Sequence, residues 1–164
     1  MKLAVTDANI FIDLILLEIL EHLFALGIEV FTTQEVVDQL NEDQLVKLSP
    51  FITANKLNVY SFDSVEIKEV LTMDAPRSLE LADKSVAWLS LHLSAMVLTG
   101  DGVLRKFCVS KKLEVRGIIW FFDQVVNLGI MDCKVAAAKM EKLVVINPRL
   151  PKDEIFSRIK IWKD

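Results

Sequence analysis

The chain has 164 residues, a length that suits one domain with a full apolar core. Hydrophobic residues make up 52% and charged residues 26%, which excludes an intrinsically disordered chain, and the five glycines and four prolines are too few for a collagen-like or linker sequence. The net charge of −4 gives no general attraction to nucleic acid, so nucleic-acid chemistry would need a local basic strip or a metal ion.

Short apolar runs alternate with helical patterns along the chain. The runs predict strands at residues 3–6, 28–31, 57–62, 95–98 and 113–115. Apolar residues at helical spacing predict helices at residues 10–26, 41–54, 64–73, 79–93, 103–110, 117–128, 133–143 and 153–162, and one from a Thr32-Thr33 cap to Leu40. This order favours an α/β three-layer sandwich with a mainly parallel central sheet of about five strands, in a single domain of residues 1–164.

Two of the predicted boundaries rest on single residues. Gly27 is a typical stop for the helix that begins near residue 10. Pro50 is a candidate break in the helix at 41–54. The two cysteines, Cys108 and Cys133, stand in apolar segments without a Cys-x-x-Cys spacing, so we expect two reduced core thiols.

The apolar content does not predict a membrane segment. The longest stretch without Asp, Glu, Lys or Arg covers 85–100, which is shorter than the ~20 apolar residues of a spanning helix and includes several polar residues. The N-terminal pattern is not that of a signal peptide, because Asp7 and Asp13 interrupt its apolar run. We therefore expect no contact with a membrane and a cytoplasmic location.

Three acidic residues stand where function gathers in a parallel sheet. Asp7 follows the first predicted strand, Asp101 follows the fourth, and Asp83 lies in the first turn of the helix before the fourth. The carboxyl ends of parallel strands share one edge of the sheet, so these side chains can converge there. Carboxylate oxygens are the ligands that Mg²⁺ and Mn²⁺ prefer. Each acid taken singly is better explained as a helix cap or a solvated turn residue.

The order and spacing of several motifs resemble the PIN domain, the metal-dependent ribonuclease fold of many toxin–antitoxin nucleases. Residues 5–14 (VTDANIFIDL) are similar to the first strand of that family and its Asp-x-Asn start. Residues 81–87 (LADKSVA) resemble the helix with the third acid, and residues 97–105 (VLTGDGVLR) resemble the Thr-x-Asp strand end with the fourth. Residues 113–118 (LEVRGI) are also similar, so the resemblance extends over residues 3–161.

This resemblance implies a PIN-like fold and a Mg²⁺- or Mn²⁺-dependent endoribonuclease that acts on an RNA substrate. It implies that Asp7, Asp83 and Asp101 bind the metal ion. It also implies the toxin of a toxin–antitoxin pair, which forms a homodimer and is inhibited by an antitoxin protein. Apolar residues such as Trp120 and Met131 would supply a partner surface, unless one large core absorbs them.

The second acid of the family has no match at its usual position. That position, in a Val-x-x-Glu-Leu setting, is Gln39 here. An amide offers one neutral carbonyl oxygen where a carboxylate offers a charged pair. Glu35 lies four residues earlier, on the same face of the predicted helix, and is the candidate replacement. The alternatives are a site with three carboxylates and a site that is weakened or lost.

Further polar residues flank the three aspartates in the sequence. Asn9 and Thr99 are candidates to hydrogen-bond the carboxylates, with ordinary helix capping as the alternative. The candidates to bind RNA phosphate are Lys84, Arg105 and Lys106, extended along the chain by Lys111, Lys112 and Arg116. A solvated helix face is the alternative explanation for these basic residues.

Two other hypotheses remain open. The chain is a degenerate PIN domain that binds RNA or protein without cleaving, which Gln39 and the negative net charge favour, or an unrelated flavodoxin-like binding domain whose acids do not converge. A Glu35 carboxylate directed at the three aspartates would favour the enzyme. A solvent-facing Glu35, with a basic side chain among the aspartates, would favour the binding domain.

Overall fold

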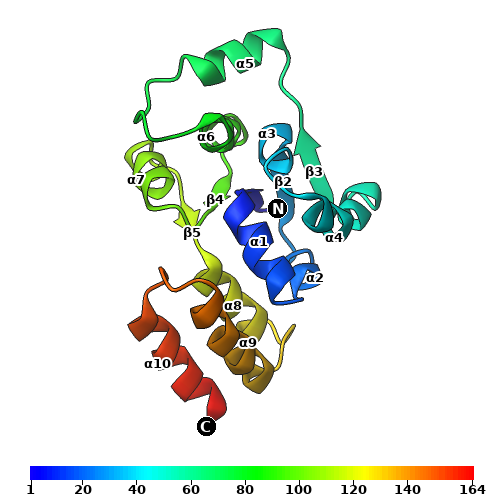
Figure 1. Cartoon of the computed structure of the whole chain (residues 1–164), viewed down its shortest axis with the longest axis vertical. Helices are drawn as coiled ribbons and strands as arrows, with labels where there is room; N and C mark the ends of the chain where they lie inside the picture. Colours follow the sequence, from blue (N-terminus) through cyan, green and yellow to red (C-terminus); the bar gives the residue numbers. More distant parts are fainter.

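Five strands form one parallel sheet at the centre of the molecule (Figure 1). The computed structural model describes all residues from Met1 to Asp164. The strand order is β3-β2-β1-β4-β5. The strands are β1 (Leu3–Thr6), β2 (Glu29–Thr33), β3 (Leu57–Tyr60), β4 (Met96–Leu98) and β5 (Val115–Arg116). The expected α/β fold with a parallel sheet of five strands is confirmed.

Helices cover both faces of the sheet. They are α1 (Ala8–Leu16), α2 (Leu20–Leu23), α3 (Gln34–Val37), α4 (Glu42–Thr53), α5 (Ser64–Leu71), α6 (Leu81–Leu93), α7 (Gly102–Ser110), α8 (Ile118–Asn127), α9 (Cys133–Ile146) and α10 (Lys152–Lys163). Figure 1 shows α1, α2 and α4 on one side of the strands and α6 and α7 on the other. Helix α6 contacts β1, β2 and β4, whereas α9 and α10 pack on each other and reach the rest of the chain through α1 and α8.

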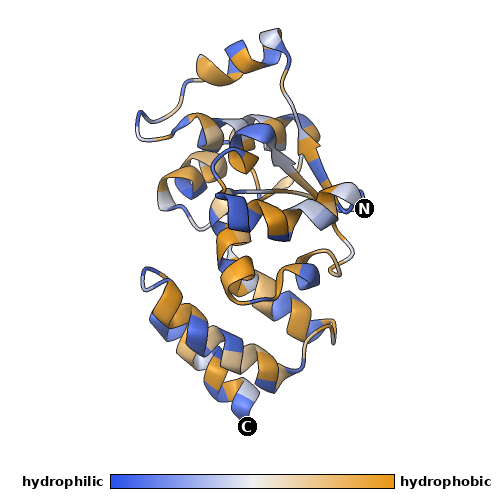
Figure 2. Cartoon of the chain, turned by 45° about the vertical axis from the view of Figure 1, so that its right-hand side comes forward, coloured by the Kyte–Doolittle hydropathy of each residue, from blue (hydrophilic) through white to orange (hydrophobic).

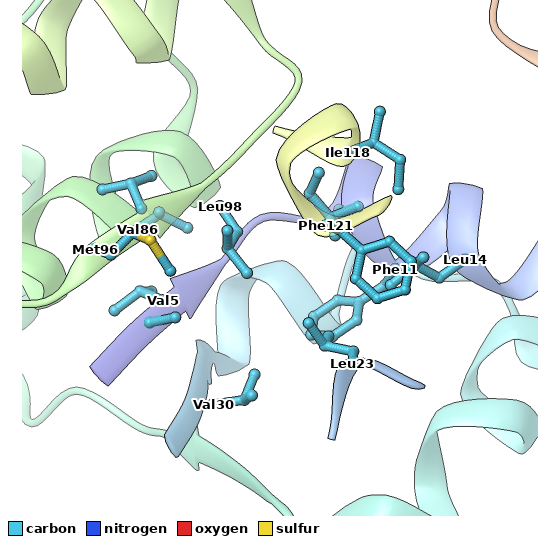
Figure 3. Close-up of a cluster of buried hydrophobic side chains, with 14 of the residues drawn as sticks. Val5, Phe11, Leu14, Leu23, Val30, Val86, Met96, Leu98, Ile118 and Phe121 are labelled. Atoms are coloured by element: carbon cyan, nitrogen blue, oxygen red, sulfur yellow. The ribbon is translucent and has the colours of Figure 1, made fainter. Parts of the chain in front are cut away.

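One cluster of 41 buried residues forms the core. Figure 3 shows Phe11 and Leu14 of α1 beside Phe121 of α8, so the core joins the sheet to the C-terminal helices. Met131 is also buried, whereas Trp120 is only partly buried. A single large core therefore absorbs most of the apolar residues that the sequence offered for a partner surface.

The predicted helix at 10–26 is two helices. Glu18 adopts a left-handed conformation (φ 58°) between α1 and α2. Gly27 follows α2 with a positive φ of 73°, as expected for a glycine that stops a helix. The break is invisible in the hydropathy pattern, because Leu17, Ile19 and Leu20 beside it are all buried.

The helix expected to reach Leu40 ends at Val37. Asn41 starts a new helix with a capping box, in which its side chain and that of Gln44 each accept a hydrogen bond from the other's backbone N–H at 2.9 Å. The chain must turn before such a cap, which shortens α3. The break considered at Pro50 is wrong: α4 continues to Thr53, although proline has no N–H to donate to the carbonyl four residues before it.

Hydrophobic and hydrophilic residues are interspersed along the helices, as Figure 2 shows for α9 and α10. None of the helices combines the length and the apolar character that crossing a membrane requires.

Candidate functional site

The three aspartates gather at the carboxyl edge of the two central strands. Strands β1 and β4 are neighbours, and the helices that follow them, α1 and α7, lie on opposite faces of the sheet (Figure 1). This reversal leaves a crevice beyond the strand ends, where ligands bind in open α/β sheets. Asp7 comes directly after β1, and its backbone N–H donates to the Leu98 carbonyl at the end of β4, at 2.9 Å.

A chain of hydrogen bonds joins Asp7 to Asp101. Asp7 Oδ1 accepts the Ala8 N–H at 2.8 Å, and Asp7 Oδ2 accepts the Thr99 hydroxyl at 2.9 Å. Thr99 Oγ1 in turn accepts the Asp101 N–H at 3.1 Å. Asp7 is 3% exposed and Thr99 is fully buried, so both are held rigidly. Thr99 thus makes the carboxylate contact that its position predicted.

All three aspartates also cap helices. Asp7 is the N-cap of α1, and Asp101 is the N-cap of α7, where its Oδ1 accepts the Leu104 N–H at 2.7 Å. Asp83 Oδ2 accepts the Glu80 N–H at 3.0 Å at the start of α6. Capping alone is therefore a sufficient reason for each position. It leaves Asp83 Oδ1 and Asp101 Oδ2 without a hydrogen bond.

The aspartates form one electrostatic cluster. Burial raises the pKa of Asp7 to about 6, the bonds from Thr99 and Ala8 lower it in part, and the charges of Asp83 and Asp101 raise it further. Burial also raises the pKa of Asp83, the Glu80 N–H opposes that shift, and the charges of Asp101 and Glu80 add to it. The Asp7 and Asp83 carboxylates are thus close enough to Asp101 for its charge to disfavour their ionised forms.

This cluster fits a hard divalent cation in its chemistry but not in its present geometry. Three carboxylates with free oxygens are a suitable donor set for Mg²⁺ or Mn²⁺. However, no three acidic, histidine or cysteine side chains lie close enough together to hold one ion. Hydrogen bonds to helix starts and to Thr99 hold the three carboxylates in their separate positions. The aspartates therefore share an edge of the sheet but not yet a coordination sphere.

Glu35 stands outside this cluster. It is half-buried in the first turn of α3, and its Oε2 is buried with no hydrogen-bond partner. Burial raises its pKa, its own N–H lowers it in part, and the charge of Asp38 adds to the rise, with no contribution from the three aspartates. Gln39 lies exposed in the turn after α3. Because α3 ends at Val37, the expected helical pairing of Glu35 with Gln39 is wrong.

The basic candidates divide between two edges of the sheet. Arg105 is half-buried and its Nη2 donates to the Thr99 carbonyl at 3.5 Å, beside the aspartates. Lys106 is exposed one residue further on. Lys111 and Lys112 instead line a hollow of about 540 Å³ at the amino ends of β1 and β4. Helix α7 carries the chain back across the sheet between Arg105 and Lys111, and β5 returns it to Arg116, whose carbonyl accepts the Thr99 N–H at 3.0 Å.

The remaining candidates lie close to the cluster in different ways. Lys84 is half-buried next to Asp83 in the first turn of α6. Asn9 is exposed and makes no hydrogen bond to any of the aspartates. Its side chain lines a separate hollow of about 510 Å³ that Asp101 also borders.

The sequence reasoning missed the residues on the far side of that hollow. Asp13 of α1 is 8% exposed, and its Oδ2 accepts the Asn147 side-chain N–H at 3.2 Å. Arg149 follows on the same loop after α9. The only signal in the sequence was that Asp13 interrupts the apolar run of residues 10–17. In α1 this acid lies between buried apolar residues.

Comparison with known proteins gives a family for the fold. A family model, DUF3368, described as a PIN domain matches residues 3–163. A domain of a functionally unknown protein from Methanocaldococcus jannaschii is similar in structure, with a TM-score of 0.51 and 16% identity over 72% of this chain and 91% of that chain. A PilT N-terminus domain protein from the archaeon Sulfolobus solfataricus P2 has a TM-score of 0.44 and 11% identity over 73% and 89%. No curated protein matches by sequence.

Proposed function

Because this chain belongs to the PIN-domain family, whose members are generally nucleases, we propose that it is a Mg²⁺- or Mn²⁺-dependent endoribonuclease. The observation that carries the proposal is the hydrogen-bonded chain from Asp7 through Thr99 to Asp101 at the switch point of the sheet. These hydrogen bonds join Asp7 and Asp101, which are 94 residues apart in the sequence, into one rigid unit. Asp83 adds a third charge to it.

The three aspartates would hold the metal ion. Asp83 Oδ1 and Asp101 Oδ2 have no hydrogen bond, and each oxygen of Asp7 accepts only one. A carboxylate oxygen accepts more than one partner, so Asp7 can keep its bonds to Ala8 and Thr99 while it binds a cation. The bound ion would supply an activated water and offset the charge of the scissile phosphate.

The surrounding residues prepare the cluster for that role. Thr99 and the Ala8 N–H fix the orientation of the Asp7 carboxylate, which limits the reorganisation that binding requires. Burial of Asp7 beside two other acids makes its ionised form costly without a counter-charge. A cation at this position is the partner that would remove this cost.

Local cations would offset the repulsion between an acidic protein and RNA. The net charge is −4, so long-range attraction to a polyanion is absent. Arg105 lies beside the end of β4, and Lys84 follows Asp83 on the first turn of α6. We assign to them the binding of phosphate oxygens next to the scissile bond.

Cleavage of a labelled single-stranded RNA, with and without added Mn²⁺, tests the proposal. We expect cleavage that requires the metal and that Asp101→Asn lowers at least about 100-fold. Asp43→Asn is the matched control, because Asp43 is exposed in the first turn of α4 and carries the same charge change. Equal loss in both variants, or cleavage that persists with a chelator, would contradict the proposal.

A second candidate function is an RNA- or protein-binding domain that does not cleave. The specific observation in its favour is the absence of a fourth acid, since Gln39 is exposed and Glu35 is not coupled to the aspartates. In this case the chain would bind RNA in a gel-shift assay with and without Mn²⁺ but leave it intact. Metal-dependent cleavage would exclude this function.

The family resemblance also supports a finer proposal, a toxin that is a homodimer and is held inactive by an antitoxin. The surface available for a partner is the exposed apolar part of α9 and α10, where Val145 is 82% and Ile161 is 67% exposed. Light scattering of the purified chain tests the dimer. Growth arrest on expression, relieved by a neighbouring gene product, tests the toxin.

A further inference from the structure

A polar hollow lies directly beside the aspartate cluster. It encloses about 510 Å³ between the first turns of α1, the loop before α7 and the loop after α9. That volume is within the range of small-molecule sites in proteins. Asp101 borders both the hollow and the cluster, so a group in the hollow would sit next to any phosphate at the aspartates.

The hollow has a charged floor. Asp13 is 8% exposed, and its Oδ2 accepts the Asn147 amide at 3.2 Å, whereas no hydrogen bond reaches its Oδ1. Asp13 lines the hollow, and its Oδ1 is free to accept a hydrogen bond from a group there. Burial raises the pKa of Asp13, and the Asn147 bond lowers it in part. The floor therefore favours a ligand edge that donates hydrogen bonds.

The walls of the hollow suit a flat base. Ile12 of α1 and Pro148 of the loop after α9 both line the hollow and offer it apolar surface. Asn9 and Arg149 stand exposed at its border. The Asn9 amide can donate to a carbonyl oxygen, and a guanidinium can stack on a base or bind its phosphate.

We propose that this hollow binds a guanine base of the RNA, next to the scissile phosphate, with Asp13 as the residue that reads it. Guanine carries two adjacent donors, N1–H and N2–H₂, which match a carboxylate that only accepts. Its O6 is left for the Asn9 amide. The inference rests on the proposed function for its substrate, but the base contact itself needs no cleavage.

Binding of oligonucleotides tests the inference independently of catalysis. The probes are three short uridine-rich RNAs that differ at one central position, which is guanosine, inosine or uridine, and fluorescence anisotropy is measured with a chelator present. Inosine lacks only the N2 amino group. We expect about ten-fold or greater preference for guanosine over inosine. Equal affinity for these two RNAs would overturn the inference.

Two variants separate reading of the base from support of the loop. Asp13→Asn keeps the shape but replaces one acceptor with a donor, so it should abolish the preference for guanosine. Asn147→Ala cuts the bond to Asp13 yet leaves both carboxylate oxygens, so it should keep the preference even if stability falls. An unchanged preference in Asp13→Asn would overturn the inference, as would its loss in Asn147→Ala alone.

Failure of the proposed function gives a different result. If the chain never cleaves RNA but prefers guanosine over inosine, the base site stands and the nuclease proposal falls. If the chain cleaves RNA with Mn²⁺ and shows no preference, the nuclease stands and the base site falls.

Discussion

The Thr99 hydroxyl donates a hydrogen bond of 2.9 Å to Asp7 Oδ2 across a separation of 92 residues in the sequence. This bond crosses the point where the strand order reverses, between β1 and β4. Because Thr99 Oγ1 also accepts the Asp101 N–H, one side chain sets the relative position of two of the three aspartates.

Thr99→Val removes this hydroxyl and keeps the branched shape. The buried Asp7 carboxylate then loses a donor, so we expect a destabilisation of about 1–3 kcal/mol and Mn²⁺ binding weaker by about 10- to 100-fold. Urea unfolding and calorimetric titration measure the two effects. Thr32→Val is the control, because its hydroxyl donates to the Thr6 carbonyl and not to an acid. Equal Mn²⁺ affinity in both variants would show that Thr99 does not orient the site.

The stability of the metal-free protein should fall with rising pH through Asp7. Its pKa is 3.8 in the unfolded chain and about 6 in the fold, so the fold favours the protonated form. This contribution is fully present below about pH 4, is lost as the pH rises through about 6, and amounts to about 3 kcal/mol. Asp7→Asn cannot ionise and should flatten the fall. Urea unfolding in the presence of a chelator, repeated over this pH interval, measures the free energy of unfolding of both proteins. The same dependence of that free energy on pH in the wild type and in Asp7→Asn would contradict the account.

The two cysteines should differ in reactivity. Burial, with a smaller effect of the Asp7 charge, raises the pKa of Cys108 to about 12, so its thiol stays protonated. Cys133 is only half-buried at the start of α9. A thiol reagent should therefore modify Cys133 quickly and Cys108 only after unfolding. Mass spectrometry of the digested protein locates the label, and rapid labelling of Cys108 in the native state would contradict its burial.

Most of the fold follows from local patterns in the sequence. Strand β1 has the predicted bounds, since an apolar run with a cap cluster behind it leaves few alternatives. The break at Glu18 could not be predicted, because buried residues continue on both sides of it. The early end of α3 depends on the capping box of Asn41, which competes with the apolar periodicity.

The part of the candidate site that lies at the ends of the strands was predictable from the sequence. The gathering of Asp7, Asp83 and Asp101 at one edge follows from parallel topology alone. Asp13 was not predictable as part of a hollow, since the loop that covers it comes from a distant part of the chain. The position of Lys112 was not predictable, because α7 lies between Arg105 and Lys112 and carries the chain to the amino ends of β1 and β4.

Two single variants, Glu35→Gln and Gln39→Glu, test whether a fourth acid takes part in binding the metal ion. Glu35 is not coupled to the aspartates and Gln39 is exposed, so we expect either change to alter Mn²⁺ affinity less than about three-fold. Glu35→Gln should instead raise stability at neutral pH, because it removes a charge that burial disfavours. Calorimetric titration of Mn²⁺ into each variant checks this, and a loss of affinity in Glu35→Gln as large as that in Asp101→Asn would make Glu35 a ligand.

The most direct test of the metal cluster is calorimetric titration of Mn²⁺ into the wild-type chain and Asp101→Asn. The account predicts one site with micromolar-to-millimolar affinity in the wild type, and its loss in the variant, since one of three carboxylates is removed. Equal Mn²⁺ binding by the two proteins, or none by the wild type, would contradict a metal centre at Asp7, Asp83 and Asp101.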